Sequence, residues 1–212
     1  MAVLNPVRLI IKNYPDNQDE ILEGEINPEK PELGKRKIPF SKELYIEKED
    51  FKEEANRKFY RLSIGKEVRL KNAYIIKAET VIKNNDGTIK EIICSYDPKS
   101  KSGSGSEESK RKVKGTIHWV TIKHSLNADV NVYDRLFMVP SPDHDKEIDF
   151  KKFINPNSLK TIKGFVEPSL FRALKGNHFQ FQRLGYFILD EINNEKLIFN
   201  KTVGLRDNWS KK

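Results

Sequence analysis

Apolar and polar residues alternate along most of the chain with the two-residue period of β-strands. The clearest case is residues 74–97, where two β-prone runs flank Asn85-Asp86-Gly87. Asp-Gly favours the positive backbone angles of a tight turn, so this segment predicts an antiparallel hairpin. Other short apolar or alternating runs lie at residues 7–11, 43–47, 115–123, 129–138, 163–166, 178–190 and 196–200. The pattern therefore predicts a mainly β protein.

Helical patterns are brief. Residues 49–58 are predicted to form about two helical turns, because Phe51 and Ala55 share one face at i, i+4 spacing. Residues 149–154 are predicted to form one further turn. Between the strand-rich blocks, residues 98–112 (PKSKSGSGSEESKRK) are rich in Ser, Gly and charge without an apolar anchor. That composition predicts a mobile surface loop.

Many short strands at close spacing are typical of small barrels and sandwiches. The 212 residues allow one large domain or two small ones. We expect two small antiparallel β-barrels with short helices and long connecting loops. The first barrel is assigned to residues 1–112 and the second to residues 113–212, and terminal strands can cross back to the first.

The composition narrows the cellular setting. Apolar residues make up 37% of the chain, and no run approaches the roughly 18 apolar residues of a membrane span. The first residues, MAVLNPVRLIIKN, lack the features of a secretory signal. The single cysteine, Cys94, excludes an internal disulfide and fits a reducing compartment. We expect a cytoplasmic protein that does not associate with membranes.

Basic charge is concentrated in particular segments. The chain has a net charge of +8, and residues 51–77 hold 8 basic and 3 acidic side chains, which gives +5. Residues 101–124 hold 6 basic and 2 acidic side chains, which gives +4. Such segments favour a face that binds a polyanion, nucleic acid above all. The alternative is a fluctuation of charge with no partner.

Catalytic patterns are absent from the sequence. It contains no GxSxG elbow, no GxxxxGK[ST] phosphate loop and no GxGxxG motif. Asp143-His144-Asp145 lies in an acidic, Pro-flanked stretch typical of a solvated turn. His118 is interpreted as a packed residue and Cys94 as a core residue. The chain alone is therefore predicted to be no enzyme, with no metal site and no cofactor of its own.

One candidate for reading nucleic acid is residues 56–71, NRKFYRLSIGKEVRLK, where basic and aromatic residues interleave. In an extended strand Arg69 and Lys71 share one face, and Val68 and Leu70 point the other way. Arginine can pair with guanine or stack on a base, and lysine can contact phosphate. The alternative is the ordinary polar face of a barrel strand.

A second candidate begins at His178. Phe179 and Phe181 share one face of a strand, and Gln180 and Gln182 lie on the opposite face, followed by Arg183. Glutamine both donates and accepts hydrogen bonds, which suits the base edges of single-stranded RNA. The alternative is again the ordinary polar face of a barrel strand.

These segments belong to a series of motifs that resembles the C-terminal region of bacterial-type glutaminyl-tRNA synthetases. The motifs are NPEKPELGKRKIPFSKELYIEKEDFKEEANRKFYRLSIGKEVRLKNAYIIK, KVKGTIHWV, VYDRLF, VEPSL, FQFQRLGYF and FNKTVGLRDNW, and they extend over residues 2–209. The resemblance implies two β-barrels that bind the tRNA anticodon. It also implies a catalytic, ATP-binding domain N-terminal to them, whose motifs do not occur here.

The resemblance also implies roles for single residues in the first candidate segment. Arg61 and Arg69 match family arginines, which implies contacts to the third and first anticodon bases. Lys58, Tyr60 and Lys71 match neighbouring positions, where the family commonly has Gln, Lys and Arg.

In the second segment, Gln180, Gln182 and Arg183 match a motif that implies recognition of the central uridine. The family often has Glu at the position of Gln182. A further family arginine that contacts this uridine is expected just upstream of Met1. Because the family's catalytic motifs do not occur here, the chain is interpreted as an excised anticodon-binding portion.

The resulting hypothesis is the anticodon-binding region of a glutamine–tRNA ligase. Its expected partners are glutamine tRNA and the enzyme's own catalytic domain, which would bind ATP, and the chain is expected to be a monomer. One alternative is the equivalent region of a glutamyl-tRNA synthetase, which would differ at the central-base readers. Another is a stand-alone RNA-binding β-barrel, which would bind RNA without dependence on the anticodon.

Overall fold

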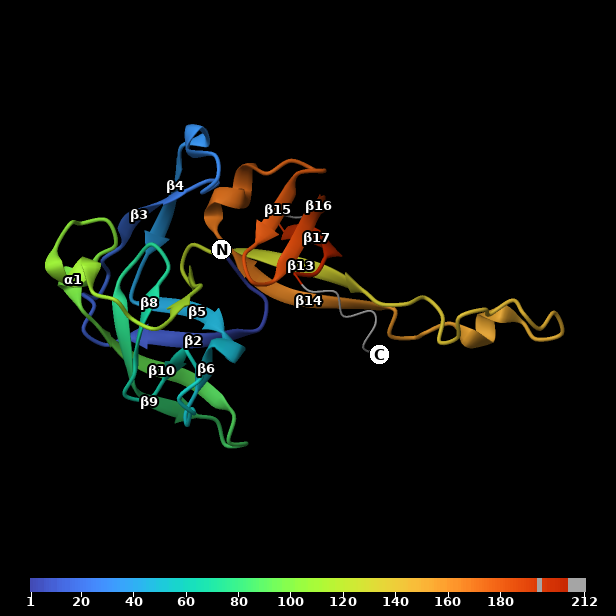
Figure 1. Cartoon of the computed structure of the whole chain (residues 1–212), viewed down its shortest axis with the longest axis horizontal. Helices are drawn as coiled ribbons and strands as arrows, with labels where there is room; N and C mark the ends of the chain where they lie inside the picture. Colours follow the sequence, from blue (N-terminus) through green and yellow to red (C-terminus); the bar gives the residue numbers. More distant parts are fainter. Residues whose placement is uncertain (194–195, 206–212) are drawn as a thin grey trace. The chain divides into compact units, whose positions relative to one another are not determined.

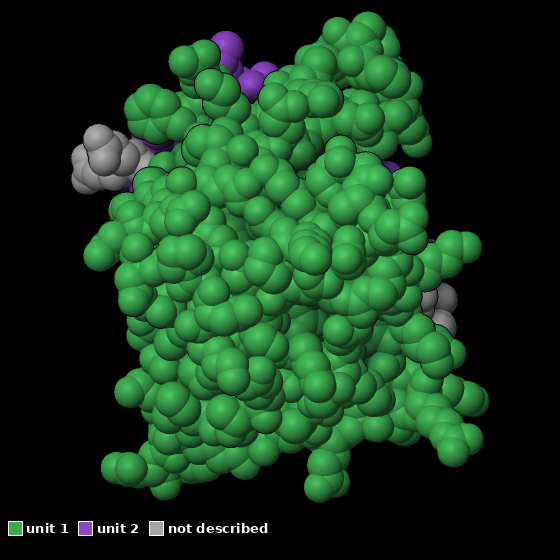
Figure 2. Space-filling model, turned by 90° about the vertical axis from the view of Figure 1, so that its left-hand side faces the viewer, with its two compact units in different colours: residues 1–127, 164–173 green, residues 128–163, 174–212 purple. Residues whose placement is uncertain are grey.

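The computed structural model describes residues 1–193 and 196–205. It divides into two compact units, unit 1 (residues 1–127 and 164–173) and unit 2 (residues 128–163 and 174–212), coloured separately in Figure 2. Both units are built from curled half-barrel sheets, so the prediction of a mainly β protein is confirmed (Figure 1). Residues 113–127 lie in unit 1. The assignment of the two barrels to residues 1–112 and 113–212 stays a prediction.

A seven-stranded sheet forms the body of unit 1, in the spatial order β11-β8-β9-β10-β2-β5-β12. In chain order its strands are β2 (Pro6–Ile11), β5 (Glu43–Glu47), β8 (Glu67–Leu70), β9 (Ile75–Lys83), β10 (Ile89–Tyr96), β11 (Thr116–Ile117) and β12 (Val120–Thr121). Strands β9 and β10 pair antiparallel, which confirms the predicted hairpin. Its turn contains Gly87 at φ +79°, as the Asp-Gly pattern requires.

Smaller pieces complete unit 1. Strand β3 (Glu20–Glu25) pairs with β4 (Lys35–Phe40), β6 (Phe51–Lys52) pairs with β7 (Leu62–Ser63), and β1 (Ala2–Val3) pairs with Phe165 and Val166. Its helical turns are η1 (Pro31–Leu33), η2 (Lys48–Asp50), η3 (Pro98–Ser100), α1 (Glu107–Lys110) and η5 (Pro168–Arg172).

The two-turn helix predicted over residues 49–58 is wrong. Only η2 forms there, and Phe51 continues as a buried strand residue that pairs with Leu62. Pairing of β6 with the following strand β7 thus overrides the local helical spacing.

Aromatic side chains pack together within the core of unit 1, among more numerous aliphatic ones. Trp119 and Phe40 are fully buried and meet edge to face, with ring centroids 5.1 Å apart. The indole N–H of Trp119 donates a 2.9 Å hydrogen bond to the carbonyl oxygen of Lys71, which satisfies its polar group. Cys94 and His118 are also buried, as predicted, and burial raises the pKa of the Cys94 thiol. The frame beneath the basic segments is therefore densely packed.

Unit 2 is smaller, and the strands in its described part follow the order β14-β13-β17-β16-β15. They are β13 (Leu126–Tyr133), β14 (Leu159–Val166), β15 (His178–Phe181), β16 (Gly185–Asn193) and β17 (Lys196–Val203), and the ends of β13 and β14 extend into unit 1. Phe181 stacks on Phe187 at 4.5 Å and meets Phe199 edge to face at 5.2 Å. Three aromatic rings thus form much of its core.

Outside the sheet of unit 2, η4 (Phe150–Phe153) confirms the predicted turn over residues 149–154. Asp143, His144 and Asp145 are exposed, in agreement with a solvated turn. Residues 206–209 of the motif FNKTVGLRDNW lie outside the described residues. Within residues 1–193 and 196–205, no helix is long and apolar enough to cross a membrane, and no acidic, His or Cys side chains cluster as a metal site would require.

Candidate nucleic-acid interface

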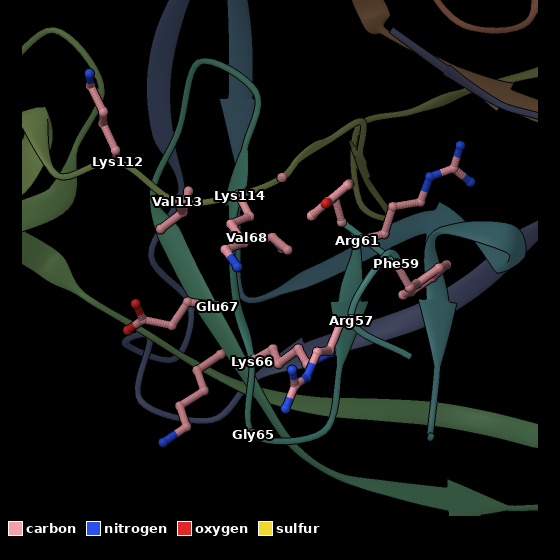
Figure 3. A pocket seen from close by; sticks show the side chains of 13 residues that line it. Arg57, Phe59, Arg61, Gly65, Lys66, Glu67, Val68, Lys112, Val113 and Lys114 are labelled. Carbon is pink, nitrogen blue, oxygen red and sulfur yellow. The ribbon is translucent and has the colours of Figure 1, made fainter. Parts of the chain in front are cut away.

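Unit 1 has an open surface pocket of about 650 Å³ between its basic segments. Figure 3 shows Lys112, Val113 and Lys114 along one side and Gly65 with Lys66 across from them. The lining residues are Arg57, Phe59, Tyr60, Arg61, Gly65, Lys66, Glu67, Val68, Lys77, Lys112, Val113, Lys114 and Gly115.

Strand pairing brings these distant residues together. Strand β11 pairs parallel to β8, and the Arg69 N–H donates to the Gly115 carbonyl oxygen at 2.9 Å. A Cβ atom on Gly115 would lie only 2.0 Å from the carbonyl oxygen of Tyr60. The two backbones can approach this closely only because residue 115 is glycine.

The pocket has an excess of positive charge. Six of its lining residues are cationic and one, Glu67, is acidic. Among the lining cations, Arg61 forms an ion pair with Asp50. The other five form no ion pair within 4.0 Å with any residue in the described part of the chain; they are Arg57, Lys66, Lys77, Lys112 and Lys114. Unpaired cations on a rigid frame are suited to attracting phosphate groups.

The aromatic residues of the pocket differ in accessibility. The face of Phe59 is covered by the Lys52 ammonium, 5.1 Å from the ring centroid. Tyr60 is 55% exposed. Tyr60 is therefore the lining aromatic that is available to stack on a base.

Besides Tyr60, Arg61 is among the residues that the family resemblance singles out, and it also lines this pocket. Its Nη1 lies 3.2 Å from the carboxylate of Asp50, which is almost fully buried, and donates to the Glu49 carbonyl oxygen at 3.1 Å. This double anchor fixes the guanidinium in place. Lys58 is exposed and lies outside the pocket lining.

The Arg69 side chain faces the loop of residues 98–111 and does not line the pocket. It donates to Ser100 O at 2.8 Å, to Ser102 Oγ at 3.2 Å and to Ser109 O at 2.9 Å. Burial, and secondarily the nearby positive charge of Arg111, lower the pKa of Arg69. The prediction that this segment is a mobile loop is therefore wrong, because these hydrogen bonds and the turns η3 and α1 give it a defined structure.

Lys71 lies in a different environment again. Its side chain is half-buried, and burial lowers the pKa of Lys71 together with the positive charge of Arg36, while the charge of Glu167 acts in the opposite direction. The four predicted residues of unit 1 thus do not converge on one cavity.

In unit 2, β15 lies at the edge of the sheet and alternates as predicted. Phe181 is buried and Phe179 half-buried against Phe199, whereas His178 and Gln180 are exposed. The Gln180 amide donates to the Tyr186 hydroxyl at 3.4 Å, a long bond that leaves much of the amide open to solvent.

Gln182 and Arg183 follow β15 in a tight turn. The Leu184 N–H donates to the Phe181 carbonyl oxygen at 2.8 Å, and Arg183 has the left-handed backbone angle φ +71°. This turn carries an exposed Arg183 and a half-buried Gln182. The predicted contacts of Gln180, Gln182 and Arg183 with a uridine stay predictions.

The predicted base-reading residues do not include five pocket cations, although Arg57 and Lys66 lie in the first candidate segment, residues 56–71; the five are Arg57, Lys66, Lys77, Lys112 and Lys114. Two signals were present. The basic run 110–114 marks the end of the loop, and Lys77 lies between the buried residues Ile76 and Ala78 of β9, which turns it outward. Neither signal shows that the two segments meet.

Comparison with known proteins adds independent findings. Two family models match the chain, both described as an anticodon-binding domain of class I tRNA synthetases (E and Q), over residues 1–97 and 116–190. The chain is 52% identical over 212 residues to a glutamine–tRNA ligase of Proteus mirabilis (strain HI4320). It is 50% identical over 213 residues to those of Enterobacter sp. (strain 638) and Salmonella newport (strain SL254). These alignments cover all of this chain but only 37% to 38% of each relative.

Proposed function

The chain belongs to the family of anticodon-binding domains of class I tRNA synthetases (E and Q), and we propose that it binds the anticodon loop of glutamine tRNA. The observation that carries this proposal is the pair of family matches in chain order, together with full-length similarity to glutamine–tRNA ligases.

Unit 1 supplies charge and a stacking surface in this function. The unpaired cations of the pocket neutralise phosphates of the anticodon loop, and Tyr60 stacks on an unpaired base. Arg61, held by Asp50, contacts the third anticodon base, and Lys58 and Lys71 contact the RNA separately, outside the pocket. A pre-fixed guanidinium loses little freedom on binding, which supports its use as a base reader.

Unit 2 supplies directional hydrogen bonds. Gln180, Gln182 and Arg183 recognise the central uridine, whose edge presents both donors and acceptors. Phe179 and Phe181 hold the strand from below, so that the amide of Gln180 stays outward.

The chain spans 37% to 38% of the length of the curated relatives that it matches. The ATP-dependent attachment of glutamine is therefore assigned to the intact protein, with ATP bound by a catalytic domain outside this chain. The chain alone is expected to be inactive in that reaction, monomeric and cytoplasmic.

Binding of the purified chain to three RNAs at physiological salt tests the proposal: glutamine tRNA, the same tRNA with its central uridine replaced, and glutamate tRNA. The expected result is a clear preference for the first. A preference for glutamate tRNA would support the alternative within the same family. Equal, salt-sensitive binding to all three would overturn anticodon recognition and leave only attraction to phosphate.

A further inference from the structure

The loop of residues 98–111 is built around the guanidinium of Arg69. One nitrogen of that group bonds to Ser100 and Ser102, and the other bonds to Ser109. The acceptors come from both ends of the loop, so a single side chain bridges it. The planar fork of arginine holds these donors in fixed directions, which the single ammonium of lysine cannot do.

Further contacts attach the loop to the sheet. Arg111 pairs with Glu67 of β8 and, at 3.2 Å, with Asp97. Ser100 is fully buried, and its hydroxyl accepts a 2.8 Å hydrogen bond from the Ile75 N–H of β9. The loop is therefore fixed to β8 and β9, the strands that lie beneath the pocket.

The loop leads directly into residues 112–114, which form one side of the pocket (Figure 3). Two of the unpaired pocket cations, Lys112 and Lys114, are in this segment. Arg69 is not among the lining residues, and its donors already serve the loop. It can influence the pocket without facing it.

We propose that Arg69 is a positioning residue, which holds the loop so that Lys112 and Lys114 face the pocket and which acts on RNA through those lysines. This role differs from the contact with the first anticodon base that the family resemblance implies. The effect on RNA rests on the proposed function, whereas the ordering of the loop does not.

A double-mutant cycle tests the route of action. Arg69→Ala is expected to weaken binding of glutamine tRNA by roughly tenfold. In a chain that already carries Lys112→Ala and Lys114→Ala, the same change should cost almost nothing more. Lys66→Ala, on the opposite side of the pocket, is the matched control and should weaken binding equally in both backgrounds. If Arg69→Ala still weakened binding by the full roughly tenfold in the chain without Lys112 and Lys114, Arg69 would contact the RNA directly and the proposal would be overturned.

Trypsin cleavage after residues 110–112, measured without RNA, tests the ordering of the loop by itself. Arg69→Ala and Arg69→Lys should both raise the cleavage rate by roughly tenfold, because the loop opens locally more often. Lys66→Ala should leave it unchanged, and near-UV circular dichroism checks that each variant stays folded. Cleavage as slow as in the parent chain would overturn the proposal. A chain that binds no tRNA would overturn the proposed function instead, while the cleavage rates would still decide the role of Arg69.

Discussion

The two units hold their outer side chains in place by different chemistry. In unit 1 many groups are held by charged pairs, such as the two-pronged contact of Arg36 with Glu167, whereas in the described part of unit 2 Lys196 pairs with Asp129. In unit 2 a ladder of mainly neutral hydrogen bonds crosses the sheet. It runs from Thr161 through Asn131 and Asn200 to Asp190, with bond lengths of 2.9, 3.1 and 3.0 Å.

This difference bears on what each unit can offer to RNA. Charge acts over about a Debye length and does not distinguish one base from another. Hydrogen-bonding side chains act only at contact, but they distinguish one base edge from another. We therefore expect unit 1 to contribute most of the salt-sensitive affinity and unit 2 a larger share of the selectivity.

The largest effect is expected from breaking the charged framework of unit 1. Arg36→Met would remove the forked partner of the buried Glu167 carboxylate and leave it the Met1 ammonium and the Ser169 hydroxyl, at a cost of about 3 kcal/mol in unfolding free energy. Denaturant unfolding measures this loss. Lys35→Met is the control: Lys35 neighbours Arg36 on β4, and its exposed pair with Glu23 of β3 should contribute at most about 1 kcal/mol. Equal losses in the two variants would refute the importance of burial.

A smaller loss is expected from breaking the ladder of unit 2. Asn200 accepts hydrogen bonds from Asn131 and Tyr133 and donates one to Asp190. Asn200→Ala should lower the unfolding free energy by about 1–3 kcal/mol, because half-buried partners lose their bonds. Asn157→Ala, at an exposed position of unit 2, should stay within about 0.5 kcal/mol. Identical unfolding curves for Asn200→Ala and the parent chain would show that the ladder does not stabilise the unit.

Local alternation in the sequence predicts the elements well where the deciding contacts are also local. It places the hairpin of β9 and β10, and it separates buried Phe181 from exposed Gln180, because neighbouring strand residues point to opposite faces. The same alternation places Val68 and Leu70 in the core.

The pocket could not be predicted in this way, because it depends on pairing between distant segments. Thr116 of β11 pairs with Arg69 of β8, and this register brings Lys114 into the pocket. The direction of the Arg69 side chain depends on Ser100 and Ser109, which the composition of their segment assigned to a mobile loop. Serines there serve as specific acceptors, and composition does not distinguish that use from solvation.

RNA binding offers a direct contrast between the units. Gln180→Ala should weaken binding of glutamine tRNA by roughly tenfold, should matter little once the central uridine is replaced, and should leave the salt slope unchanged. Lys66→Ala should weaken binding of both RNAs alike, by a factor smaller than about ten. It should also lower the slope of log affinity against log salt concentration by about 0.7. Affinities measured across a salt series report both quantities.

Lys90→Ala is the control for this contrast. It removes the same charge from an exposed position of unit 1 outside the pocket, and should change affinity less than Lys66→Ala. If Lys66→Ala lost the discrimination between the two RNAs and Gln180→Ala retained it, the roles assigned to the two units would be reversed.

The smallest effect is expected from the exposed carboxyl group of Asp19 in unit 1. Lys123 Nζ and His124 Nε2 lie 2.6 and 2.8 Å from the Asp19 carboxylate, and these hydrogen bonds, that of Lys123 first, lower the pKa of Asp19. Because the pKa is lower in the folded state, the stabilisation is complete above the ordinary pKa of the carboxyl, near pH 4, and is lost as the pH falls below it. Asp19→Asn should therefore slightly lower the melting temperature at pH 7 and make it less sensitive to pH between about 4 and 2. Asp143→Asn, in the exposed turn of unit 2, should leave both unchanged, since Asp143 forms no ion pair with another described residue. If Asp143→Asn shifted the acid transition as much as Asp19→Asn, charged pairing would not distinguish the units.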